Sequence, residues 1–187
     1  MKYVFTCLLL LGCLLAQAQT SSCDSIVWKA NRKLTWADFK GTPAPNDRVS
    51  ARTRSNFVRE WSAKDATLKT TMICFFSPCL SWSRNKTSER LLRHEQGHFD
   101  ITEYYKRIYY KRIAEANYTP ETLPDILKAA YQSITQECGA MQEAYDLETN
   151  HSLIAAKQTE WEQKITYLLN TVKDFDKEEL VVALPVR

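Results

Sequence analysis

The chain changes its hydrophobic period near Trp82, and this change separates a strand-rich part from a helix-rich part. The clearest strand pattern covers residues 66–76, where apolar and polar positions fall on opposite faces, as in a half-buried strand. The apolar face carries Leu68, Met72, Cys74 and Phe76, and the polar face carries Lys69 and Thr71. A polar break at residues 63–65 separates this stretch from another candidate strand over residues 49–61. The two stretches together predict a β-hairpin within residues 49–76.

Two shorter segments are also predicted as strands, residues 25–29 near the start and residues 180–184 near the end. Residues 41–47 contain Gly, Pro, Asn and Asp in close succession, which is typical of a surface loop.

Beyond Trp82 the apolar positions recur at steps of three and four, which predicts helices. The first is expected over residues 88–116, with Thr87 or Ser88 as the N-cap and Glu89 in the first turn. Pro120 and Pro124 open a second helix. Its stripe consists of Leu127, Tyr131, Ile134, Cys138, Met141, Tyr145 and Glu148, and a third stripe consists of Ile154, Gln158, Trp161, Ile165, Leu168 and Val172.

The second and third stripes do not join in phase, because Glu148, His151 and Ile154 follow each other at two successive steps of three. This slip predicts a break or bend near Asn150, with His151 at the corner. The pattern as a whole predicts an α+β fold, in which an N-terminal antiparallel β-sheet is followed by long helices. Residues 19–187 are expected to form one domain.

Residues 1–18 have the three parts of a secretory signal: basic Lys2, an apolar run over residues 3–16, and the small-residue site Ala16-Gln17-Ala18. Cleavage is predicted after Ala18, which places the protein in the periplasm or outside the cell. A membrane anchor is the alternative, but the apolar run is shorter than the roughly 20 residues that a membrane-spanning helix needs. A lipid anchor at Cys13 is a lower-ranked alternative, because Leu11 is bulky for such a site.

Net charge and cysteine content restrict the possible partners and crosslinks of the protein. The formal net charge of +3 falls by one when Lys2 leaves with the signal, which is too small to indicate nucleic acid as a partner. Four cysteines then remain, and an even number in an exported protein predicts disulfides with three pairings open. They are Cys23, Cys74, Cys79 and Cys138. A cysteine zinc cluster is the alternative, but the chain has no Cys-x-x-Cys motif.

Candidate chemistry lies in the first predicted helix, in the motif His94-Glu95-Gln96-Gly97-His98. Histidines four residues apart lie on one helix face and can bind a single Zn²⁺, while Glu95 is placed to act as general base toward a metal-bound water. Gly97 is expected to leave space beside the ion. The alternative is a chance pattern on a solvated face, which the apolar flanking residues disfavour.

A third ligand is needed, and the chain has three histidines in all. We predict His151, because three histidines with one open position make a common catalytic zinc site. A helix-capping role for His151 is the alternative. Glu148 is the rival ligand, with Asp146 behind it, or else the residue that holds the distal nitrogen of a ligating histidine.

These residues resemble a bacterial family, domain-of-unknown-function family 922, whose members are predicted to be secreted zincin-like proteases. The similar segments are residues 34–41, Ser81-Trp82, residues 94–101 with Glu103, and residues 145–151. The family has a glycine after the last histidine, where this chain has Ser152. The resemblance implies a zinc-peptidase-like fold and site but supplies no substrate.

The resulting hypothesis is a secreted zinc-dependent metallopeptidase that acts on a protein or peptide, with His94, His98 and His151 as zinc ligands and Glu95 as the catalytic base. Tyr105 and Tyr145 are candidate partners of the oxyanion, although core packing explains both equally well. The alternative hypothesis is a non-catalytic exported protein with structural zinc or a partner-binding helical face. A cell-wall amidase differs from the first hypothesis only in substrate.

Overall fold

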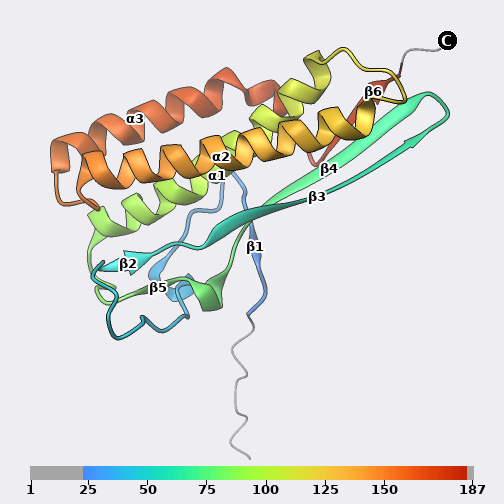
Figure 1. Ribbon diagram of the computed structural model, residues 1–187. Helices are drawn as coiled ribbons and strands as arrows, with labels where there is room; N and C mark the ends of the chain where they lie inside the picture. Colours follow the sequence, from blue (N-terminus) through green and yellow to red (C-terminus); the bar gives the residue numbers. More distant parts are fainter. Residues whose placement is uncertain (1–22, 185–187) are drawn as a thin grey trace, which may run out of the picture.

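The computed structural model describes residues 23–184, which form an antiparallel sheet covered on one face by three long helices (Figure 1). The predicted α+β fold is confirmed. The predicted signal peptide, residues 1–18 with Cys13, lies outside the described residues. No helix within residues 23–184 has the length and apolar character needed to cross a membrane.

The main sheet is built around a long hairpin of β3 (Ser55–Lys64) and β4 (Thr67–Phe76). On the other edge of β4 lie two short strands, β1 (Ile26–Val27) at one end and β6 (Glu179–Ala183) at the other. The predicted apolar face of β4 is buried, whereas Lys69 on the opposite face is exposed. The hairpin turn lies at Asp65 and Ala66, both with positive φ, as a two-residue type I′ turn requires.

The helices follow the predicted pattern closely. α1 (Glu89–Glu115) begins after the N-cap Ser88, whose hydroxyl accepts a hydrogen bond from the Leu91 amide. α2 (Leu123–Thr149) and α3 (Ala155–Thr171) follow. α1 packs against the sheet and against both other helices, so its buried side chains form the centre of the core.

A second, two-stranded sheet holds the segment that faces the first turns of α1. It pairs β2 (Ala51–Arg52) with β5 (Trp82–Ser83). Beyond β2, the Thr53 hydroxyl donates a hydrogen bond to the Glu95 carbonyl of α1, 3.2 Å away. The small sheet and the helix are thereby fixed next to each other.

The break between α2 and α3 lies where the phase slip predicts it. Asn150, His151 and Ser152 have φ angles of 46°, 50° and 74°, so three successive residues adopt the left-handed conformation. Ser152 has a φ of 74°, an angle that glycine adopts without steric cost and that strains a serine.

The cysteines differ in part from the prediction. Cys23 and Cys79 form a disulfide, which ties the segment before β1 to the segment between β4 and β5. Cys74 and Cys138 are free and buried, so the expectation that all four act as disulfide cysteines is wrong for these two. Cys74 belongs to the inward face of β4 and Cys138 to the inward face of α2, where both serve as small apolar core residues.

Removing the disulfide with the double variant Cys23→Ser/Cys79→Ser is expected to lower the free energy of unfolding by about 2–4 kcal/mol, because the crosslink restricts the unfolded chain. Denaturant unfolding measures the change. A reductant should shift the midpoint of the parent protein toward that of the variant and leave the variant unchanged. An equal shift of both proteins by the reductant would contradict the assignment.

The variant Ser152→Gly is expected to raise the free energy of unfolding by up to about 1 kcal/mol, because glycine relieves the left-handed strain. The matched control is Ala129→Gly at an exposed position within α2, which should lower it by a similar amount. Thermal and denaturant unfolding of the two variants tests the conformation of the corner, and a destabilised Ser152→Gly would show that the turn is not strained.

Candidate metal centre

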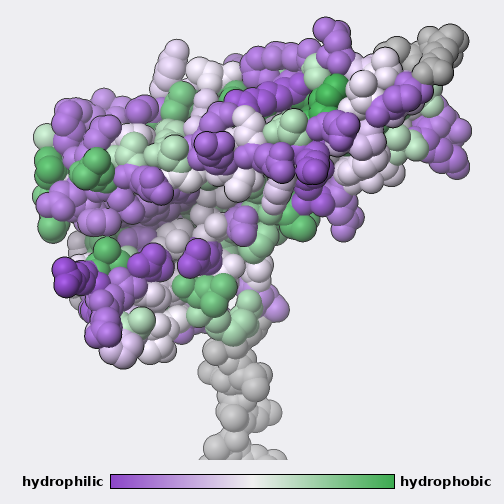
Figure 2. All heavy atoms as spheres, viewed as in Figure 1, coloured by the Kyte–Doolittle hydropathy of each residue, from purple (hydrophilic) through white to green (hydrophobic). Residues whose placement is uncertain are grey.

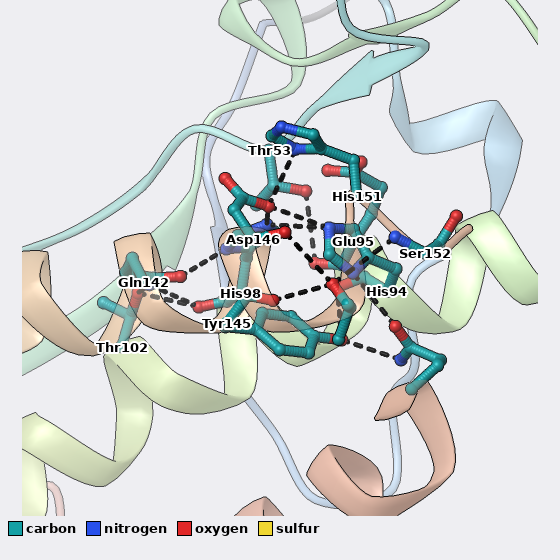
Figure 3. A network of polar contacts seen from close by, with 12 residues as sticks. Thr53, His94, Glu95, His98, Thr102, Gln142, Tyr145, Asp146, His151 and Ser152 are labelled. Atoms are coloured by element: carbon teal, nitrogen blue, oxygen red, sulfur yellow. Dashed lines mark hydrogen bonds and ion pairs between the residues drawn. The ribbon is translucent and has the colours of Figure 1, made fainter. Parts of the chain in front are cut away.

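Three side chains from two helices converge on one point (Figure 3). His94 and His98 lie one turn apart on α1, with their Nε2 atoms 3.2 Å apart. Asp146, near the end of α2, places Oδ1 3.0 Å from His94 Nε2 and 3.1 Å from His98 Nε2. His94 is buried, His98 is nearly so, and Asp146 is about one third exposed. The cluster therefore lies at the inner end of an accessible site.

Two glutamines orient the histidine rings. His94 Nδ1 lies 3.0 Å from Gln158 Oε1, and His98 Nδ1 lies in close contact with Gln142 Oε1. The amide nitrogens of these glutamines donate elsewhere, Gln158 to the Tyr145 hydroxyl and Gln142 to the His98 carbonyl, so the amide oxygens face the rings. An amide oxygen only accepts, and each Nδ1 must therefore carry the proton. Both Nε2 lone pairs are then directed toward Asp146.

This donor set fits a metal ion. Two deprotonated Nε2 atoms and a carboxylate oxygen lie 3.0–3.2 Å from each other, and their lone pairs repel unless a cation lies between them. Zinc bonds of about 2.0–2.1 Å in a tetrahedral arrangement separate ligand atoms by roughly 3.3 Å. Small outward shifts of these side chains would accommodate zinc.

The electrostatics of the cluster favour positive charge. Burial by itself raises the pKa of Asp146, but the close approach of the His94 and His98 rings outweighs it and holds that pKa well below its usual range. Burial lowers the pKa of His98, but Asp146 and the charge of Glu95 outweigh it and raise that pKa. Both shifts show that the carboxylates stabilise a cation at this point.

Glu95 contributes a buried carboxylate beside the cluster. It is 2% exposed, and within residues 23–184 no group forms a hydrogen bond with its Oε2 atom. Beside the cluster lies a cavity of about 310 Å³, which His94, Glu95, His98 and Asp146 line on the helix side. A buried acceptor without a partner is costly in free energy, and a ligand or water in the cavity would satisfy it.

Tyr145 packs against the histidine rings on the side of α2. Its ring stacks on His94 with the ring centres 4.5 Å apart, and its hydroxyl donates to the His94 carbonyl. A Cβ atom at Gly97 would lie 2.8 Å from Tyr145 Cζ, so Gly97 makes room for this ring and not, as predicted, for the ion. Because the Tyr145 hydroxyl is held by His94 and Gln158, packing explains Tyr145. Tyr105 likewise packs in the core.

His151 approaches the cluster without joining the group of three. Its Nδ1 atom lies 3.2 Å from Asp146 Oδ1, its side chain is 47% exposed, and it lines the same cavity. Glu148 is exposed and accepts a hydrogen bond from Trp161 Nε1, so the alternative in which Glu148 supports a histidine is wrong. Gln142 and Gln158 take that role.

Asp146 is the residue that sequence reasoning underrated. The sequence places it only behind the rival ligand Glu148, yet its carboxylate oxygen contacts the Nε2 atoms of both histidines. The available signal was its spacing of four residues from Gln142, which places the two polar side chains on one face of α2 beside the apolar stripe.

Comparison with known proteins agrees with the resemblance noted in the sequence. Residues 79–152 match the family described as bacterial protein of unknown function (DUF922). This segment includes the motif of α1 and extends through Asp146 and His151. No curated protein and no solved structure gives a significant match. The segment that carries the candidate metal centre is therefore similar to the bacterial DUF922 family.

Proposed function

We propose that the protein is an exported zinc-dependent hydrolase that cleaves peptide bonds. The observation that carries this proposal is the convergence of His94 Nε2, His98 Nε2 and Asp146 Oδ1 next to the unpartnered Oε2 atom of Glu95. The Cys23–Cys79 disulfide supports an oxidising compartment outside the cytoplasm, as does the signal-like sequence of residues 1–18.

The donor set supports zinc with an open position. Two imidazoles and one carboxylate are a ligand set used by catalytic zinc sites, which keep the fourth position for water. In this proposal Asp146 is the third ligand. His151 then lies beside it and positions its carboxylate, and it remains the alternative third ligand. The cavity on the β2 side of the cluster gives a substrate access to the open position.

When bound, zinc would supply a Lewis acid and lower the pKa of a bound water to about 7. Glu95 Oε2 accepts the proton of the attacking water and delivers it to the nitrogen of the leaving amine. Gln142 and Gln158 hold the histidines in the tautomer that leaves Nε2 free. The Thr53 hydroxyl holds the backbone at Glu95 and so fixes the position of the base.

A second candidate function is an exported protein in which zinc has a structural role. The observation that favours it is the approach of His151 Nδ1 to Asp146 Oδ1, since a histidine that fills the fourth position would close the site. Such a protein would bind zinc as tightly and cleave nothing. The exposure of His151 argues for the open site.

The variant Glu95→Gln tests the hydrolase directly. The purified parent protein is expected to contain one zinc per chain and to cleave a denatured protein substrate. Glu95→Gln should retain the zinc and lose at least about 100-fold in kcat/KM, because the base is gone while the ligands remain. Metal analysis and a cleavage assay measure both.

The control for this experiment is Glu89→Gln, which removes an exposed acid from the first turn of the same helix. It should leave both zinc content and cleavage unchanged. Absence of zinc from the parent protein would overturn the metal centre. Equal cleavage by Glu95→Gln would overturn the role of Glu95, and zinc without cleavage in the parent protein would favour the structural site.

The third ligand is identified by comparing Asp146→Ala with His151→Ala. Loss of a ligand should weaken zinc binding by more than the roughly 10–100-fold typical of supporting residues, and His151→Ala should fall within or below that range. Competition with a chelator measures both affinities. The opposite order, with His151→Ala as damaging as His94→Ala, would make His151 the ligand.

A further inference from the structure

A second cavity, of about 330 Å³, adjoins the cavity of the metal centre. The two share Val49, Ser50, Leu91 and His151 as walls, so they lie side by side, and we refer to them together as the cleft. The cleft runs between the helices and the small sheet of β2 and β5, where the surface in Figure 2 is hollowed and bordered by hydrophilic residues with some hydrophobic ones among them. The side chain of His151 lies between the metal centre and the second cavity.

The second cavity has a one-sided charge. Arg48 and Arg90 line it, and no aspartate or glutamate does. Both arginines are exposed, and neither has an ion pair or a side-chain hydrogen bond with any residue of the described chain. Two nearby arginines differ: Arg52 pairs with Asp47, and Arg84 donates to three backbone carbonyls of residues 44–49. Arg52 and Arg84 thus have hydrogen-bond partners within the loop, whereas Arg48 and Arg90 face the cavity and are free to bind a ligand.

The geometry points to a carboxylate as that ligand, and we propose that the second cavity is a subsite for a carboxylate of the peptide substrate. A guanidinium group matches a carboxylate with two parallel hydrogen bonds and is less strongly hydrated than an ammonium group. Leu91 and Leu153 offer apolar surface for the carbon chain that carries the acid. The inference rests on the proposed function, because it treats the occupant of the metal cavity as a peptide.

The carboxylate has two sources in a peptide, an acidic side chain and the free C-terminus, and the proposal covers their shared chemistry. Either source would place the acid beyond His151, away from Glu95 and Asp146. The preference should weaken at high salt, because the arginines are exposed.

Binding to Glu95→Gln protein tests the subsite without any turnover. The probes are N-acetylated alanine hexapeptides with one Glu or Gln at each position in turn, each made with a free and with an amidated C-terminus. We expect one Glu position or the free C-terminus to improve affinity about tenfold, as a charge-assisted hydrogen bond does. Calorimetric titration measures it. The double variant Arg48→Gln/Arg90→Gln should abolish the difference.

The control is Lys64→Gln/Lys128→Gln, which removes two exposed positive charges outside both cavities and should preserve the preference. A preference for Glu with amidated peptides identifies the side chain, and a preference for free over amidated peptides identifies the C-terminus. Equal binding of all peptides, or a preference that survives in the arginine variant, overturns the subsite. Zinc-dependent cleavage without the preference would refute only this inference, whereas the preference without cleavage would refute only the proposed hydrolase.

Discussion

The contact between α1 and α2 at Gly97 sets the geometry of the candidate metal centre. The absence of a side chain at Gly97 lets the ring of Tyr145 lie directly on α1, where it stacks on His94. Asp146 follows Tyr145 in the chain, so the position of that ring determines where the carboxylate lies relative to the two imidazoles. A larger residue at Gly97 would move α2 outward and separate Asp146 from both Nε2 atoms.

The polar groups around this contact form one connected network in which most donors and acceptors are satisfied. Gln158 joins His94 to Tyr145, and Gln142 joins His98 to the backbone of α1 and to Thr102. Such a network holds side chains in one arrangement because each member depends on its neighbours. Within the described residues, Glu95 Oε2 is the atom of the centre that the network leaves without a partner. Glu95 is therefore placed at the cavity, where the proposed chemistry needs a proton acceptor.

Much of this fold is encoded locally. The two-residue period of β4, the stripes of the helices and the phase slip at residue 150 each arise within a short stretch of chain, so the sequence predicts them. The motif from His94 to His98 is local as well. The identity of the third residue of the cluster depends instead on the rotation of α2 against α1, which helical spacing alone does not determine. Asp146 and Glu148 are two residues apart and point in different directions, one toward the histidines and the other toward Trp161.

Local sequence patterns also fail to predict the disulfide pairing and the backbone conformation of the corner at residues 150–152. Cys23 and Cys79 are 56 residues apart, and their pairing depends on how the segment before β1 lies across the end of the hairpin. The left-handed turn directs His151 toward solvent and toward Asp146. Non-glycine residues rarely adopt this backbone conformation, and the periodic pattern of apolar residues does not indicate it.

The cleft separates its charges along its length, and this separation connects the two proposals. Glu95 and Asp146 lie at the inner end, whereas Arg48 and Arg90 lie beyond His151. An extended peptide that enters such a cleft experiences a field that draws its negative groups toward the arginines. A cation at the inner end would offset the two carboxylates there and leave Glu95 as the acceptor of a proton. The strained corner at residues 150–152 carries His151 and lies between the two ends of the cleft. Such strained backbone persists only where the surrounding fold holds it, and it often occurs at binding sites.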